Sequence, residues 1–170
     1  LGIRYPIIQA PMAGGPSTPQ LVAAVSNAGG LGSLAGGCLQ PEALRQAIAE
    51  VRALTDRPFA VNLAVTSPAE RDSIRIARAY ELLAPYRTEL GLSLEPPVLP
   101  DPPEFATQLN AVLEEGVPVL SFIFGAPEPV DLARLREAGI ITLGTATHLL
   151  EAIVLEESGV DFIIAQGAEA

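Results

Sequence analysis

The chain of 170 residues is 49% hydrophobic and carries a formal net charge of −10, from 20 acidic and 10 basic residues. This length suits one domain with a substantial core, and no apolar run approaches the roughly 20 residues of a transmembrane helix, so we expect no membrane span. The negative charge argues against nucleic acid and anionic membrane surfaces as partners, and the single cysteine, Cys38, excludes an internal disulfide framework and fits the reducing cytoplasm.

Short apolar runs alternate with amphipathic stretches along the chain, which is the pattern of repeated βα units. Each run is closed by Gly, Pro or a charged residue, as expected for strands that are buried on both faces of a parallel sheet. In chain order, the pattern predicts a strand at 6–10, a helix at 19–28, a strand at 31–35, a helix at 41–54 and a strand at 59–63.

A longer excursion follows over residues 66–103, which we interpret as an insertion on a barrel loop. It contains a predicted helix of about 18 residues from Pro68 and a proline-rich loop at 95–103. Beyond it, the pattern predicts a helix at 104–116, a strand at 117–122, a helix at 133–138, a strand at 140–143, a helix at 149–157 and a strand at 160–165.

The alternation indicates an α/β fold with a parallel sheet. We predict a (β/α)8 TIM-type barrel, present as an incomplete portion of about six βα units over residues 1–170, because a closed eight-stranded barrel typically has about 250 residues. The alternative is an open, doubly wound sheet, since both folds use right-handed crossovers and the connections do not separate them.

A glycine-rich segment at 29–35 fits the relaxed dinucleotide-binding fingerprint through Gly30, Gly32 and Ala35, with Glu50 at a suitable distance downstream. That fingerprint requires a strand before the glycines and a helix that begins within them. Here a predicted helix ends at the glycines and a strand follows. We therefore favour a helix C-cap followed by a closely packed strand.

The end of the first predicted strand carries the sequence 9–15, in which Pro11 and Met12 precede Gly14 and Gly15. Active sites of barrels lie at the C-terminal ends of the strands. Proline and the polarisable methionine can present a flat apolar surface to a ring system, and the glycines let backbone approach a ligand. An ordinary βα turn with a core methionine explains the same residues equally well.

Polar residues also stand at or near the ends of later strands: Asn62, Ser121, Thr145 and Gln166. In a barrel they would converge on one rim. Amides such as Asn62 and Gln166 suit the edge of a flavin, which alternates hydrogen-bond donors and acceptors. Each amide alone could equally cap a neighbouring loop.

Five segments in order resemble the nitronate monooxygenases: IQAPMAGG at 8–15, NAGGLG at 27–32, AVNL at 60–63, VLSF at 119–122 with Gly125, and AQGAEA at 165–170. The resemblance implies a (β/α)8 barrel that binds FMN and oxidises alkyl nitronates with dioxygen. It also implies that Ala10, Pro11 and Met12 lie along the isoalloxazine ring, and that Asn62 and Gln166 hydrogen-bond to FMN.

The chain departs from the family pattern at its ends. It opens on Leu1 almost directly before a strand, so we expect a trimmed N-terminus. The family's catalytic histidine would come just after Ala170, and the last two strands, with the phosphate-binding loops, would follow. We therefore expect no catalytic residue and no metal ligand in this chain. We expect a surface or capping role for His148, and a buried inert thiol at Cys38 in preference to one at the edge of the pocket.

Two alternatives remain. One is an FMN-dependent reductase on the same barrel, which would pass hydride from NAD(P)H to a quinone or an enoyl thioester. The other is a catalytically incomplete fragment that buries its open barrel edge against a partner. For the leading hypothesis the expected partners are a small nitronate, dioxygen and a second copy of the chain in a homo-oligomer, and the expected location is the cytoplasm.

Overall fold

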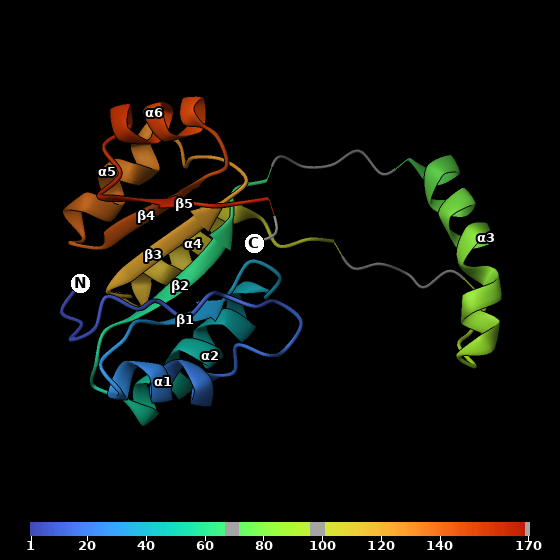
Figure 1. Ribbon diagram of the computed structural model, residues 1–170, viewed down its shortest axis with the longest axis horizontal. Helices are drawn as coiled ribbons and strands as arrows, with labels where there is room; N and C mark the ends of the chain where they lie inside the picture. The colour runs from blue at the N-terminus through green and yellow to red at the C-terminus, as the bar shows by residue number, and fades with distance from the viewer. Residues whose placement is uncertain (67–71, 96–100, 169–170) are drawn as a thin grey trace. The chain divides into compact units, whose positions relative to one another are not determined.

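The computed structural model of the chain describes residues 1–66, 72–95 and 101–168 (Figure 1). It divides into two compact units, one formed by Leu1–Thr66 with Pro102–Ala170 and the other by Ser67–Asp101. None of the described helices is both long enough and apolar enough to cross a membrane.

The first unit is built on a parallel sheet whose five strands follow one another in chain order (Figure 1). The strands are β1 (Gly32–Ala35), β2 (Phe59–Ala64), β3 (Val119–Ile123), β4 (Ile141–Ala146) and β5 (Phe162–Ala165). The helices of this unit are α1 (Pro19–Asn27), α2 (Pro41–Leu54), α4 (Phe105–Glu114), α5 (Pro129–Glu137) and α6 (Leu149–Glu157). Each neighbouring pair of strands is parallel, which confirms the predicted alternation of strands and helices.

The helices pack against only one face of this sheet. Alternate strand residues, including Val61, Leu63 and Phe122, are buried with helix side chains in one core. Residues of the opposite parity, such as Ala60 and Val119, belong to a separate core to which none of the described helices contributes. A doubly wound sheet has helices on both faces. That alternative is therefore wrong, and the chain is a portion of a β/α barrel, as predicted.

The predicted first strand, at 6–10, is shorter than expected. Only one parallel bridge forms, between Ile8 and Leu31, supported by hydrogen bonds from Leu31 N–H to Ile7 O and from Gln9 N–H to Leu31 O, both at 2.9 Å. Pro6 and Pro11 flank this bridge and have no amide hydrogen to donate to a ladder. The segment therefore runs beside β1 without extending into a longer strand.

Three helices begin with proline as their first residue: α1, α2 and α5. Proline suits this position because its missing N–H would have no partner there and its backbone angle φ is already helical. The hydroxyl of Thr18 also accepts the N–H of Leu21, so it caps α1. Helix α5 begins at Pro129, where the same proline rule applies, and it contains residues 133–137 of the stretch expected to be helical.

The second unit contains helix α3 (Ser73–Glu89), which is capped by Asp72. Asp72 Oδ1 accepts the N–H groups of Ile74 and Arg75, each at 3.0 Å. The guanidinium of Arg87 lies 5.3 Å from the centre of the Tyr80 ring. The start that the sequence predicts at Pro68, and part of the proline-rich loop, lie outside the described residues. The insertion boundaries 66–103 stay a prediction.

Helix α1 lies very close to β1 at Gly32. A Cβ atom on Gly32 would lie 2.0 Å from the carbonyl oxygen of Val22, well inside van der Waals contact. The hydroxyl of Ser26 accepts the Gly32 N–H at 3.1 Å and donates to Pro58 O at 2.9 Å. Helix α1 thus ends before the glycines and β1 follows them, which is the reverse of the order that dinucleotide binding requires. The glycines serve close packing.

We expect Gly32→Ala to lower the free energy of unfolding by about 3 kcal/mol, because the backbone of α1 must move away from β1. Gly37→Ala is the matched control. A Cβ atom there would meet Ala64 atoms at 3.2 and 3.3 Å, which a small shift relieves, so we expect a loss below about 1 kcal/mol. Urea unfolding followed by circular dichroism measures both, and equal losses would contradict the packing argument.

Candidate functional site

A cavity of about 410 Å³ lies on the helix-free face of the sheet. This volume falls in the range of about 300–1,000 Å³ that small-molecule sites occupy. Four of the predicted cofactor residues line it together: Ala10, Pro11, Asn62 and Gln166. Ser33, Ser121 and Thr145 add hydroxyl groups to walls that are otherwise apolar. The polar strand residues therefore converge on one cavity.

Asn62 and Ser121 face each other across β2 and β3. They are register partners in the sheet, and Asn62 Nδ2 donates a hydrogen bond to Ser121 Oγ at 2.9 Å. Both residues are buried, with exposed fractions of 6% and 3%. Buried polar groups are stable only where they are hydrogen-bonded, so this pair fixes the orientation of the amide at the cavity wall.

Gln166 comes directly after β5. Its N–H donates to Ala146 O at 2.9 Å, which continues the pairing of β4 with β5 by one residue. Gln166 and Thr145 border this cavity and also a neighbouring hollow of about 560 Å³. Both residues therefore stand where the two cavities meet.

The side chain of Gln9 takes the place of a backbone partner for β1. Its Nε2 donates to Ser33 O at 3.2 Å, and its Oε1 accepts the Ser33 N–H at 3.1 Å. Nε2 also contacts Ser17 Oγ at 3.0 Å, and that hydroxyl accepts the Met12 N–H at 2.8 Å. The network fixes residues 10–12 beside the cavity. Sequence reasoning missed this role, for which the signal was one amide within an apolar run.

Met12, the fifth predicted cofactor residue, does not line the cavity that holds the other four. It borders a different cavity of about 470 Å³, together with Cys38. The prediction of a buried thiol at Cys38 is wrong, because this cysteine is exposed. It lies in the turn between β1 and α2, directly after the buried Gly36 and the half-buried Gly37.

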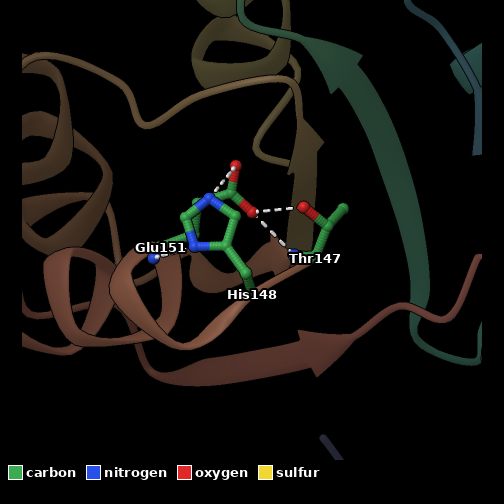
Figure 2. A network of polar contacts seen from close by, with 3 residues as sticks. All are labelled: Thr147, His148 and Glu151. Carbon is green, nitrogen blue, oxygen red and sulfur yellow. Dashed lines mark hydrogen bonds and ion pairs between the residues drawn. The ribbon is translucent and has the colours of Figure 1, made fainter.

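His148 caps the N-terminus of α6, as predicted (Figure 2). Its Nδ1 accepts the Glu151 N–H at 3.4 Å, and its Nε2 lies 3.4 Å from Glu151 Oε1. The ring is more than half exposed and borders the 560 Å³ hollow, and it is absent from the lining of the 410 Å³ cavity.

Glu151 is held by Thr147 in the same network (Figure 2). Its Oε2 accepts the Thr147 N–H at 2.6 Å and the Thr147 hydroxyl at 2.8 Å. These two hydrogen bonds, the backbone one first, lower the pKa of Glu151 below its ordinary value because they favour the charged carboxylate. The interaction therefore stabilises the fold fully above the unfolded pKa of Glu151, and its contribution is lost as the pH falls through the lowered pKa.

Comparison with known proteins places these residues in a family. The profile of the nitronate monooxygenases matches residues 1–170. A probable nitronate monooxygenase from Staphylococcus saprophyticus is 44% identical over 172 residues, which cover 100% of this chain and 48% of that protein. The chain therefore spans about half the length of the curated relatives it matches.

Solved structures agree with this result. A nitroalkane oxidase from Streptomyces ansochromogenes superposes with a TM-score of 0.89 and 42% identity, over 99% of this chain and 48% of the other. A mutant of FabK from Thermotoga maritima superposes with a TM-score of 0.74 and 31% identity, over 99% of this chain and 44% of the other. The arrangement of strands and helices is thus shared with both.

We expect Gln9→Glu to lower the free energy of unfolding by about 2 kcal/mol, because the carboxylate cannot donate to Ser33 O or Ser17 Oγ. The same change at Gln20, which is exposed on α1, should alter it by less than about 0.5 kcal/mol. Thermal unfolding gives the stabilities. Amide hydrogen exchange should also be faster at Met12 in the Gln9 variant, and unchanged protection there would contradict the network.

Replacing Thr147 with Val removes one of the two hydrogen bonds to Glu151 and should raise the pKa of Glu151 toward its ordinary value. A pH titration of the Glu151 carboxyl carbon by NMR measures this pKa. Thr88→Val, which removes a hydroxyl bonded to Ala84 O on α3, should leave it unchanged. A Thr147 variant whose Glu151 titrates as in the original protein would show that the hydroxyl has no influence on the carboxylate.

Proposed function

Because the chain belongs to the nitronate monooxygenase family, we propose that the protein carrying it oxidises alkyl nitronates with dioxygen, with FMN bound in the 410 Å³ cavity. The observation that carries this proposal is the convergence of Ala10, Pro11, Asn62 and Gln166 on that one cavity. These residues come from three distant parts of the sequence, so their convergence does not follow from any single local motif.

The cavity fits the flavin ring in its chemistry. Ala10 and Pro11 offer small apolar groups on one wall, and Pro11 has no N–H that would require a partner there. Amides at Asn62 and Gln166 match the alternating donors and acceptors of the ring's polar edge. When bound, FMN supplies the electron transfer and the reaction with dioxygen that side chains cannot perform.

The chain's own residues would bind and orient the ring. We assign packing against the ring face to Ala10 and Pro11, and hydrogen bonding to its edge to Asn62 and Gln166. Asn62 is suited to this role because Ser121 holds its amide in one orientation. Met12 directly follows Pro11, so we keep it in the proposal as a ring contact from the end of the same segment.

We propose that no residue of this chain acts as the catalytic base. His148 already accepts the Glu151 N–H as the cap of α6 and is absent from the lining of the 410 Å³ cavity. From the resemblance, we propose that the base is a histidine just after Ala170. We also propose a cytoplasmic location, which the single cysteine favours.

The alternative activity is an NAD(P)H-dependent reductase with FMN on the same barrel. The similarity to FabK supports this alternative. FabK is 31% identical over 99% of this chain, so proteins other than nitronate monooxygenases share these strands and helices. We also keep the alternative of a catalytically incomplete fragment that binds a partner. We also keep the homo-oligomer as a proposal.

The test of the activity is anaerobic mixing of the FMN-loaded protein with single substrates in a stopped-flow spectrometer. We expect bleaching of the flavin absorbance by ethyl nitronate alone, and oxygen consumption when air is admitted. Rapid bleaching by NADH, with none by the nitronate, would refute the monooxygenase and support the reductase.

A variant tests the assigned cofactor residues. Asn62→Ala should weaken FMN binding about tenfold or more, since it removes a hydrogen bond to the ring and leaves Ser121 without its donor. Asn110→Ala is the control, because Asn110 binds the exposed Arg134 on α5. Fluorescence titration of FMN measures both affinities, and equal affinities would remove Asn62 from the site.

A further inference from the structure

The hollow of about 560 Å³ lies directly beside the proposed flavin site. It is bordered by the loop that follows β3 and by the first turns of α6. It shares three lining residues with the 410 Å³ cavity: Ile123, Thr145 and Gln166. A ligand whose reacting group lies in one cavity can therefore extend into the other.

The walls of this hollow are largely apolar and exposed. Phe124 is 78% exposed, Leu150 is 69% exposed and Val154 is 53% exposed, and the buried side chain of Leu155 lies behind them. Large apolar groups gathered around one hollow mark a binding surface, because an apolar ligand that covers them removes their surface from water.

The charges around the hollow favour a neutral chain over an anionic group. None of the twelve described residues that line it is Lys or Arg. Glu151 lies among them, and its hydrogen bonds from Thr147 favour the carboxylate form. An anion would be repelled here, so an anionic head group should stay at the other end, by the polar groups of Thr145 and Gln166.

The backbone of Phe124 is an independent sign of function. Its φ of +69° is the only positive value at a non-glycine residue in the described parts of the chain. This left-handed conformation is unfavourable for a bulky side chain and persists only where the surroundings impose it, as they often do at ligand sites. Here Val65 N–H donates to Ile123 O at 2.9 Å, which ties the preceding residue to the end of β2.

We propose that this hollow binds the unbranched alkyl chain of the substrate while the reacting head group lies in the 410 Å³ cavity. The identity of the head group, which we take to be a nitronate, rests on the proposed function. The binding of the alkyl chain rests on the hollow alone. The protein would then prefer straight-chain nitronates of several carbons to the shortest ones. Val154 and Phe124 would set this preference.

The test is the dependence of kcat/KM on chain length, from ethyl to hexyl nitronate. We expect kcat/KM to rise about three- to fourfold for each added methylene, because each one leaves water for an apolar wall. Val154→Phe fills the hollow and should abolish this rise. Val130→Phe, an equally bulky change at an exposed site on α5, should keep it.

A second variant guards against misfolding. Val154→Thr keeps the shape of the side chain but adds a hydroxyl to the apolar wall, so it should reduce the rise for each methylene without closing the hollow. Melting temperatures establish that all three variants are folded. The same chain-length dependence in Val154→Phe, Val154→Thr and Val130→Phe would overturn the inference.

Binding of unreactive ligands separates this inference from the proposed function. Straight-chain carboxylates of two to eight carbons carry a planar anionic head, and calorimetry should show affinity that grows with chain length and is lost in Val154→Phe. If nitronates are not oxidised but this pattern is observed, the proposed function is refuted and the alkyl-chain site is still supported. Enoyl thioesters reduced with the same chain-length dependence would also support the hollow. Nitronate oxidation without any dependence on chain length would overturn it.

Discussion

The helices of the first unit cover one face of the parallel sheet and leave the other face without helices, and the rest of the structure depends on this arrangement. Strand residues alternate between the two faces. One parity joins the large core with α1, α2, α4, α5 and α6, and the other parity forms a small core of strand side chains. The strand side chains of the second face leave space beside them, and this space is the 410 Å³ cavity.

This constraint explains why polar residues are tolerated in the middle of buried strands. Asn62 and Ser121 are buried in the middle of strands, yet they bond to each other across neighbouring strands. Ser33 is likewise matched by Gln9. The polar groups are therefore satisfied within the wall of the cavity, and their orientation is set before any ligand arrives.

Much of this arrangement could be predicted from the sequence because the local signals are strong. Helices α2 and α6 occupy the predicted residues, since proline at the first position or a capping side chain marks their starts. That Asn62 and Gln166 line the same cavity could be predicted because the C-terminal ends of parallel strands lie at the same edge of the sheet. The Gln9 network could not be predicted, because it depends on the register between segments 24 residues apart. The exposure of Cys38 depends on the path of a turn, which composition does not determine.

The contact between Gln9 and Ser33 also bears on the tendency of the chain to aggregate. An unpaired strand edge is a template on which a second chain can add its own strand, and this is a common start of aggregation. Ser33 turns both its N–H and its C=O toward the side of β1 that faces away from β2, and one amide side chain occupies both. Together with the bridge at Ile8, the amide leaves no free backbone pair at Ser33 to which a foreign strand could bind.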